Sequence, residues 1–413
     1  MTLKGRWGML KTEPIIKFFV AALTFYGMST FEGPLLSIKS VSALGHYTDW
    51  IVGHVHSGAL GWNGFLAFGM LYYMVPKLWN TELHSKKMAE QHFWLGLVGI
   101  ILYYVSMVVA GITQGLMWKA IDVNGQLVYP EFVDTVVRLV PLYWIRALGG
   151  LLYLSGFILM LVNMAKTIKS ARGTVGDTQI SDLTNRNTDE GKSPRLFEGY
   201  ATWFTVASLI AILVGTVIEI YPTLNIHKYA SPSSTTAPFT ALEQEGRDLY
   251  VREGCYLCHS QQIRPLVDEK LRYGDPSTIE ESMYDHPFQW GSKRTGPDLA
   301  RVGKKYPDMW HYQHMIKPTD MQPKSIMPEY PWLAKKSIDY SQLRKKLNVL
   351  RNVGVPYTDE QVANADVDAK KQASEIADGL KKQGVASSVE DKEILALIAY
   401  LQSLGQKTTT GGK

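Results

Sequence analysis

Two cysteines and a histidine stand at the spacing needed to attach a haem of the c type. Cys255 and Cys258 are separated by two residues, and His259 follows at once. Each thiol can form a thioether bond to a haem vinyl group, and the histidine can then ligate the iron. The chain has 2 cysteines in all, and a zinc site would need further Cys or His ligands. We therefore predict covalent haem c; the alternative is a chance motif in a soluble domain.

The iron of such a haem needs a ligand on its other face, and Met327 is the best candidate. Because Pro328 follows it, Met327 avoids the helical conformation and lies in an extended loop. A thioether ligand raises the reduction potential, which suits an acceptor of electrons from soluble cytochromes. The alternative is that Met327 fills core space. Other methionines in this region are Met283, Met309, Met315 and Met321.

A loop downstream of the motif can orient the histidine ligand. In the segment Gly296-Pro297-Asp298-Leu299, the proline can fix a backbone carbonyl against Nδ1 of His259. An ordinary turn is the alternative interpretation of this segment.

Two further histidines lie inside an apolar run. His54 and His56 are two residues apart, so on a helix they point about 200° away from each other. They cannot chelate one metal from one face, but they can serve two cofactors on opposite sides of the helix. Polar side chains within a membrane are costly and are usually functional. We therefore favour haem ligation over the alternative of interfacial histidines that bond only to their neighbours.

Two charged residues in the apolar half leave alternatives open. Glu32 lies near the end of the first apolar run and could be a proton or ion site, or a partner for a nearby hydroxyl or arginine. Arg146 could contact haem propionates, but we favour an arginine that extends to the membrane interface.

The hydropathy of the chain changes from an apolar first half to a polar, Lys-rich second half. Runs of about 20 apolar residues can span a bilayer, and a buried helix of a soluble protein is a weak alternative for so many. We expect a mainly α fold with about five transmembrane helices and a class I cytochrome c-like α domain. The runs are Ile15–Ile38, Ile51–Val75, Phe93–Met117, Leu139–Met164 and Ala201–Ile220. The net charge is only +5, and the absence of a basic stripe interleaved with aromatic residues excludes nucleic acid as a partner.

Lysine and arginine residues near the ends of these runs predict the orientation. They all fall on one side if the amino terminus is cytoplasmic: Lys4, Arg6, Lys11, Lys77, Lys86, Lys87, Lys166, Lys169, Arg172 and Arg195. The amino terminus does not resemble a cleaved signal peptide. We therefore expect a multi-pass protein of the bacterial inner membrane whose residues after Tyr221 lie in the periplasm, where haem c is attached.

The composition also predicts the domain boundaries. We expect a four-span part (1–165), a flexible cytoplasmic linker rich in small polar residues (166–194), an anchor helix (195–222), a periplasmic haem c domain (223–405) and a disordered tail (406–413). Such a linker suggests a fusion of two subunits. Within the haem c domain, a capped helix should begin at Thr240 and lead to Cys255. A last helix, Asp391–Leu404, should cover one edge of the haem.

The motifs resemble those of a known family. His54-Val-His56-Ser-Gly-Ala-Leu-Gly-Trp62, preceded by Tyr26-Gly-Met-Ser-Thr-Phe-Glu-Gly-Pro34, looks like the carboxy-terminal part of the catalytic subunit of cbb-three type (C-type) haem–copper cytochrome c oxidases. From Arg195 onwards the chain resembles the monohaem second subunit of the same complex. The segments that carry this second resemblance are Glu253–Ser260, Asp285–Leu299 and Ile326–Trp332.

The resemblance implies roles for several residues. His54 would ligate the high-spin haem b at which oxygen is reduced, and His56 would ligate the low-spin haem b. Cys255, Cys258 and His259 would hold haem c, with Met327 opposite. The family passes electrons from soluble cytochrome c through haem c and the b-type haems to oxygen, which it reduces to water while it translocates protons.

This chain departs from the family in one respect. The copper-ligating histidines belong to amino-terminal spans of the catalytic subunit that have no counterpart here, and His46, His84 and His92 lie in loops or at span ends. Copper B is therefore expected in the complete complex, but not on this chain. We expect a truncated fusion or one piece of a split subunit, which is inactive alone. Its partners would be the missing part of subunit I, a dihaem cytochrome c subunit and the soluble donor.

Two other functions remain open at this point. A nitric oxide reductase component would share the His-x-His helix and a one-span cytochrome c subunit. A membrane-tethered electron carrier would use the four spans only as an anchor, and His54 would then bind nothing.

Overall fold

The computed structural model describes residues 7–171, 200–225, 236–385 and 389–406. These residues form helices joined by turns and three isolated β-bridges, and no β-strand occurs among them. The mainly α expectation is therefore confirmed. Two compact units are defined: one comprises Met1–Arg172 with Ala237–Lys413, and the other comprises Gly173–Thr236.

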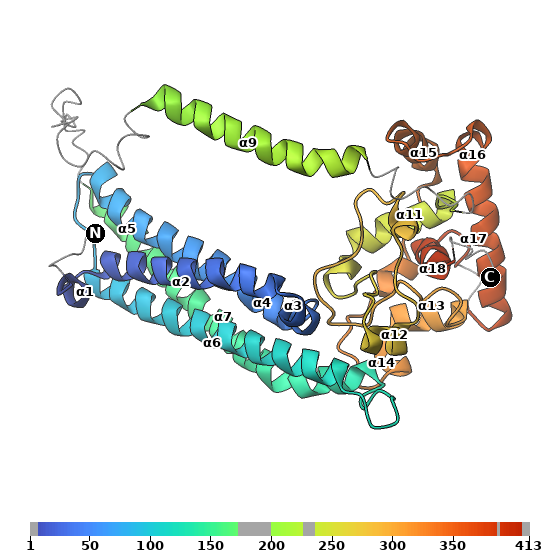
Figure 1. Ribbon diagram of the computed structural model, residues 1–413, viewed down its shortest axis with the longest axis horizontal. Coiled ribbons are helices and arrows are strands. Elements are labelled where there is room, and N and C mark those ends of the chain that lie inside the picture. Colours follow the sequence, from blue (N-terminus) through green and yellow to red (C-terminus); the bar gives the residue numbers. More distant parts are fainter. Residues whose placement is uncertain (1–6, 172–199, 226–235, 386–388, 407–413) are drawn as a thin grey trace. The chain divides into compact units, whose positions relative to one another are not determined.

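Four helices among the described residues are long and apolar enough to cross a membrane. In the first unit these are α2 (Pro14–Ser37), α6 (Lys86–Lys119) and α7 (Phe132–Ser170), and in the second unit α9 (Ala201–Leu224). Figure 1 shows α6 and α7 running side by side. They correspond to four of the five predicted spans, although α6 and α7 begin seven residues earlier than hydropathy indicated.

The second predicted span is helical but divided. It consists of α4 (Asp49–His56), a π-helical segment η1 (Ser57–Gly64) and α5 (Phe65–Leu78). A π-helical segment widens the turn, and such segments often occur at functional sites. The segment η1 begins directly after His56. His54 and His56 therefore lie in the last turn of the regular helix α4, just before the π-helical segment.

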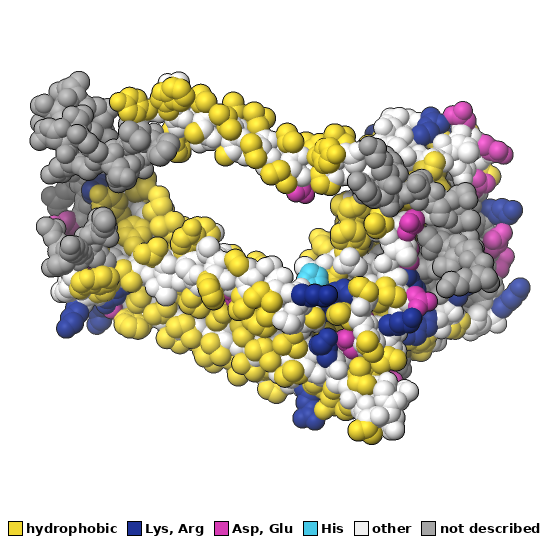
Figure 2. Space-filling model, viewed as in Figure 1, with side chains coloured by type: hydrophobic (Ala, Val, Ile, Leu, Met, Phe, Trp, Pro, Cys, Tyr) yellow, Lys and Arg dark blue, Asp and Glu magenta, His cyan; other side chains and the backbone are white. Residues whose placement is uncertain are grey.

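Aromatic rings fill the interior of the helical bundle of the first unit. Phe18 and Phe65 are completely buried, and Phe25, Phe68 and Phe93 pack around them. Apolar side chains also cover the outer surface of the bundle helices, whereas charged side chains gather over the carboxy-terminal domain (Figure 2). An exposed apolar surface of this extent fits helices that face lipid.

The carboxy-terminal domain of the first unit is built from short helices. The longer ones are α11 (Ala241–Arg252), α12 (Val267–Tyr273), α13 (Asp308–Ile316), α15 (Leu343–Asn352), α17 (Ala365–Lys382) and α18 (Glu393–Ser403). The shorter elements of the unit are α1 (Met9–Thr12), α3 (Lys39–Gly45), η3 (Cys255–Leu257), η4 (Ile279–Ser282), α14 (Pro318–Met321), η5 (Pro331–Ala334), η6 (Tyr340–Gln342) and α16 (Asp359–Ala363).

The helix that leads into the cysteine motif begins as predicted. Thr240 caps α11, its hydroxyl accepts the backbone N–H of Glu243, and the Glu243 carboxylate accepts the backbone N–H of Thr240. This reciprocal capping box satisfies two amides that the first helical turn leaves unpaired. The predicted last helix is α18, whose ends lie within one or two residues of those expected.

One predicted boundary is wrong. The linker was expected to begin at residue 166, but α7 continues to Ser170. The reason is a tertiary contact: Asn163 and Thr167 bond the backbone of His84 and Ser85 in the turn before α6, so the last turns of α7 are packed. The rest of the predicted linker, from residue 172, and the predicted tail from 407 lie outside the described residues.

The crossing of α11 and α18 requires a glycine. A β-carbon at Gly246 would lie 1.9 Å from the backbone oxygen of Ala396, so the two helices would have to separate. We predict that Gly246→Ala destabilises the domain by about 3 kcal/mol, since overpacking against backbone cannot be relieved by a rotamer change.

Denaturant unfolding of the detergent-solubilised chain, followed by near-ultraviolet circular dichroism, measures this loss. The matched control is Gly379→Ala in α17, where a β-carbon meets no atom within 4 Å. The control should be neutral or more stable by up to about 1 kcal/mol. Equal stability of the two variants would contradict the packing argument.

Candidate functional site

The cysteine motif forms a tight loop after α11. Gly254 has a positive φ of 73°, which ends the helix, and Cys255 begins the short turn η3. The backbone N–H groups of Cys258 and His259 both donate to the Cys255 carbonyl, at 3.1 and 2.9 Å. Both cysteines are free thiols, and burial raises the pKa of the Cys255 thiol to about 12. The pair is therefore available for thioether bonds rather than joined in a disulfide.

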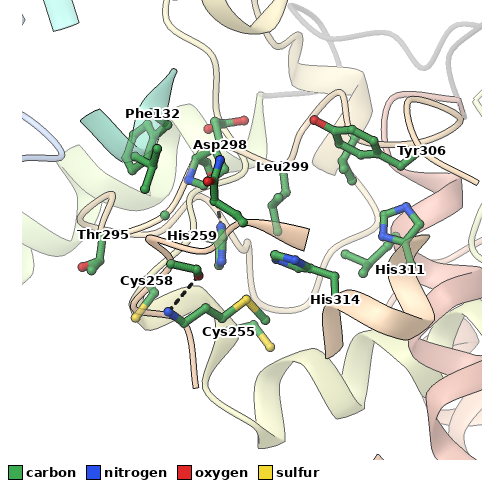
Figure 3. Close-up of a pocket in the computed structure, with 18 of the residues that line it drawn as sticks. Phe132, Cys255, Cys258, His259, Thr295, Asp298, Leu299, Tyr306, His311 and His314 are labelled. Atoms are coloured by element: carbon green, nitrogen blue, oxygen red, sulfur yellow. Dashed lines mark hydrogen bonds between the residues drawn. The ribbon is translucent and has the colours of Figure 1, made fainter. Parts of the chain in front are cut away.

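The orientation of His259 is fixed by the loop that the sequence singled out. The carbonyl of Pro297 accepts a hydrogen bond from Nδ1 of His259 at 2.8 Å, which confirms that expectation (Figure 3). With its proton on Nδ1, the ring can offer the Nε2 lone pair to a metal. Burial also lowers the pKa of His259. The imidazole is therefore neutral, as a ligand must be.

Gly296 allows the loop to lie directly against this ring. A β-carbon at Gly296 would come within 2.3 Å of the His259 ring. The backbone N–H groups of Thr295 and Gly296 both donate to the Cys258 carbonyl, at 2.9 Å each. On the other side of the histidine, the Ser260 carbonyl accepts the backbone N–H of Leu299 at 2.9 Å, so backbone bonds join the loop and the motif before and after His259.

A cavity of about 400 Å³ opens beside the motif. Cys255, Cys258 and His259 line one wall, and Leu397 and Leu401 of α18 line another. The last helix therefore covers part of the cavity, as the sequence predicted. Apolar walls with a few directed polar groups are the usual construction of a cofactor site.

Met327 also lines this cavity. It lies in a loop without regular secondary structure, and its backbone N–H donates to the Ser325 hydroxyl at 3.2 Å. Of the other candidate methionines only Met315 reaches the cavity, and it lies on α13, 7% exposed. The remaining candidates, Met283, Met309 and Met321, do not line it.

Two histidines of α13 line the cavity and were missed by the sequence analysis. His311 is 1% exposed, and its Nε2 is buried without a hydrogen-bond partner, as is Nδ1 of His314. Burial lowers the pKa of each to about 4, so both are neutral. Trp310 stacks on His314 with ring centroids 4.5 Å apart and on Tyr306 at 4.0 Å. The signal available in the sequence was the spacing of three residues between His311 and His314, which places both on the same face of a helix.

Unpaired polar atoms inside a cavity indicate a missing partner, because a buried polar group without one costs free energy. The donor set of the cavity fits a haem: two thiols for covalent attachment, an oriented imidazole, a thioether and two further imidazoles for polar substituents. The residues present therefore agree with the group that the motif predicts.

In the bundle, His54 is held by a buried carboxylate. Its Nδ1 lies 3.2 Å from Oε2 of Glu32, which is 6% exposed. The other carboxylate oxygen accepts from Trp50 Nε1 at 2.5 Å and from the Tyr104 hydroxyl at 3.2 Å. Glu32 is thus the centre of a network that orients His54, and the Nε2 atom of that ring is left for a ligand.

His56 faces a different side of the same helix. Its Nδ1 bonds the Val52 carbonyl at 2.8 Å, and its ring lies 4.7 Å from that of Tyr103 on α6. His54 contacts α2 and His56 contacts α6, so the structure places the two rings on separate flanks, as their spacing predicted. Both are half-buried.

Arg146 points into the bundle. Its Nη1 lies 3.8 Å from the sulfur of Met107, and its guanidinium lies 5.1 Å from the centre of the Tyr143 ring. Tyr143 in turn donates to the carboxylate of Asp49 at 2.8 Å, at the first turn of α4.

The remaining early histidines are dispersed. His92 was expected at a span end, but it lies inside α6, completely buried, with Nδ1 3.1 Å from the Tyr72 hydroxyl. Among the described residues there is no group of three or more His, Cys, Asp or Glu that could hold a metal ion.

Helices long and apolar enough to cross a membrane, a CxxCH cavity and a His-x-His helix are the features from which the sequence analysis predicted a membrane-bound haem protein. The family described as cytochrome c oxidase, mono-heme subunit/FixO matches residues 194–408, and the family described as cytochrome c and quinol oxidase polypeptide I matches residues 1–152. The chain belongs to the mono-heme subunit/FixO family of cytochrome c oxidases.

Individual relatives match the first part of the chain. A cytochrome c oxidase subunit 1 homolog of Agrobacterium tumefaciens and the subunit 1 of Rhodobacter capsulatus are each 53% identical over 169 residues, 41% of this chain and 31% and 32% of theirs. The Cbb3-type cytochrome c oxidase subunit CcoN1 of Stutzerimonas stutzeri is 47% identical over 173 residues, 42% of this chain and 36% of its own. The chain thus spans about a third of the length of these relatives.

The contact between Gly296 and His259 generates a prediction. In Gly296→Ala the new methyl group displaces the imidazole, so the ring no longer presents Nε2 to the cavity. We expect covalent haem per chain to fall about tenfold or more, the usual effect of disturbing a group that orients a metal ligand.

In-gel peroxidase staining of the denatured chain, normalised to protein, measures the attached haem. Gly379→Ala serves again as the control and should stain like the wild type. Full staining of Gly296→Ala would show that the ring does not depend on this close contact.

Proposed function

We propose that the chain is the component of a cbb-three type cytochrome c oxidase through which electrons from a soluble cytochrome c reach the b-type haems. The matches to an oxidase subunit 1 and to the mono-heme subunit support a place in such an oxidase. Their adjacency in one chain supports a fusion of the two subunits.

One observation carries the proposal. His54, His56 and His259 each have Nδ1 bonded to an oxygen acceptor, which leaves Nε2 as the free nitrogen of the ring. A metal-ligating histidine is almost always held in this way, by an oxygen acceptor on the ring nitrogen that does not face the metal.

The residues of the chain have distinct roles in this proposal. Cys255 and Cys258 anchor haem c, His259 and Met327 ligate its iron, His56 ligates the low-spin haem b and His54 the high-spin haem b. When bound, these groups supply one-electron redox chemistry and, at the high-spin haem with copper B, the reduction of oxygen to water. Glu32 holds His54 and its proton, and the cavity walls exclude water from haem c.

The setting is the bacterial inner membrane, with the amino terminus in the cytoplasm and the haem c domain in the periplasm. The distribution of Lys and Arg supports this orientation. The partners are the other spans of subunit I with their copper ligands, a dihaem cytochrome c subunit and the soluble donor. Proton translocation is a property of the whole complex, and the chain alone is inactive.

Pigment analysis of the purified complex tests the proposal. We predict covalent haem that stays with this chain in a denaturing gel and is lost in Cys255→Ala, together with b-type haem that acid acetone extracts. We further predict that His54→Ala abolishes donor-driven oxygen uptake, because the remaining residues cannot replace the ligand.

The outcomes separate the proposal from the membrane-tethered carrier and test the role of His54. Covalent haem c without extractable haem b would leave only a membrane-tethered carrier. Oxygen uptake that survives His54→Ala would exclude this histidine from the catalytic haem.

The buried carboxylate of Glu32 generates a second prediction. Glu32→Gln keeps a hydrogen-bond acceptor for His54 but removes the negative charge that makes the imidazole a stronger donor. We expect the reduction potential of the haem ligated by His54 to rise and oxygen uptake to fall about tenfold.

Redox titration of the separate haem bands measures this shift. The control is Glu13→Gln, since the Glu13 carboxylate pairs with Lys86 at the start of α6, away from the histidines. Haem c should keep its potential in both variants. An unchanged high-spin potential in Glu32→Gln would mean that the carboxylate does not act through His54.

A further inference from the structure

One loop of the bundle is buried in the carboxy-terminal domain of the same unit. Tyr47, between α3 and α4, has a fully buried side chain and a positive φ of 67°, which is uncommon for a bulky residue. Its hydroxyl donates to Oε1 of Gln262 at 2.6 Å. Such a backbone conformation persists only where the surroundings hold it. Tyr47 is thus a point at which the two parts of the unit are joined.

Arg294 holds this tyrosine from two directions. Its backbone N–H donates to the Tyr47 carbonyl at 2.7 Å, and its guanidinium lies 4.4 Å from the centre of the Tyr47 ring. The guanidinium of Arg264 lies 5.5 Å from the same ring. Cation–π contacts are strongest when they are desolvated, as they are here.

The same arginine holds the haem-attachment loop. Its Nε donates to the Ser260 hydroxyl at 2.7 Å, and its Nη2 lies 3.2 Å from Oδ2 of Asp298. Ser260 directly follows His259, and Asp298 directly follows Pro297, whose carbonyl orients the His259 ring. Arg294 therefore bonds the residue that follows His259 and the residue that follows Pro297.

A second set of contacts supports the same junction. Arg264 donates to the Ser42 carbonyl in α3 at 3.1 Å, and Arg272 donates to the Trp118 carbonyl in the last turn of α6 at 3.4 Å. The carbonyls in the last turn of a helix carry partial negative charge, so an arginine interacts favourably with them. Two arginines of the domain thus bond carbonyls in the last turns of two helices of the bundle.

In the bundle, Tyr47 lies just before α4, the helix that carries His54 and His56. Thr48 caps α4 by accepting the backbone N–H of Trp50, and α4 runs from Asp49 to His56 without a break. A regular helix transmits the position of its first turn to its last. The position of His54 and His56 therefore follows that of Tyr47.

We propose that Tyr47 is a positioning residue that fixes the His259 loop against the start of α4, so that the haem c site and the His54–His56 helix keep one separation. The proposal rests on the proposed function, in that the separation matters because electrons cross it. The role of the His46–Thr48 loop is then to hold the two sites at a fixed distance, which the residues proposed as haem ligands do not do themselves.

The test uses Tyr47→Ala in the purified full complex and two measurements. Hydrogen exchange, read on peptides that cover residues 291–299, reports the Arg294 amide that bonds Tyr47. We expect exchange there to become about tenfold faster, the effect of losing a buried hydrogen bond and a cation–π contact. Stopped-flow spectroscopy should show haem c reduced by the donor at the normal rate, while the following reduction of haem b slows about tenfold, as misplacement by about an ångström can produce.

Matched variants separate positioning from general damage. Tyr47→Phe keeps the ring under Arg294 but loses the bond to Gln262, and its effect should be smaller than that of Tyr47→Ala. Tyr221→Ala alters a tyrosine that is 66% exposed on α9 and should change neither measurement. If Tyr47→Ala does not accumulate, Gln262→Leu carries the test, because it removes only the acceptor of the Tyr47 hydroxyl.

The results also separate this proposal from the proposed function. Wild-type complex without covalent haem c or without haem b would refute the function itself. Complex with all haems, but with normal exchange and normal haem b reduction in Tyr47→Ala and in Gln262→Leu, would overturn the positioning role alone.

Discussion

The proposed function depends on which ring nitrogen of each proposed ligand histidine is left free. A neutral imidazole has one protonated nitrogen, and the acceptor that bonds it decides which nitrogen can face a metal. Here Nδ1 is bonded in all three cases, to a carboxylate at His54 and to backbone carbonyls at His56 and His259. A charged acceptor makes imidazole a stronger donor than a neutral one does. The chain therefore gives His54 an electronic character that the other two lack.

The sequence predicted those features of the site that depend on interactions between residues close together in the chain. The cysteine motif, the Pro297 carbonyl and the capping box at Thr240 each depend on a few adjacent residues, and each lies where it was expected. The opposite flanks of His54 and His56 follow from helical geometry alone. About half of the candidate site, namely the positions of the residues proposed as ligands and the elements that carry them, could thus be predicted from the sequence.

The rest of the site could not be predicted, because it depends on contacts between residues that are far apart in the sequence. The bond from Tyr47 to Gln262 joins residues 215 positions apart, and no spacing rule indicates it. His311 and His314 became significant only when the fold brought α13 to the cavity. The π-helical turn after His56 had no signal in the local pattern, and the last turns of α7 are held by tertiary contacts to residues before α6.

The contacts of Arg294 define the relative position of the loops that they join more than they stabilise the contact between them. Its guanidinium is 1% exposed and pairs with the buried carboxylates of Glu269 and Asp298. Burying charges costs free energy that their mutual attraction only roughly offsets, so an apolar contact could hold the domain equally well. An apolar contact, however, can slide, whereas a guanidinium with several bonded partners has one position. Since that position includes the residue after His259 and the loop before α4, geometric definition is what this buried charge contributes.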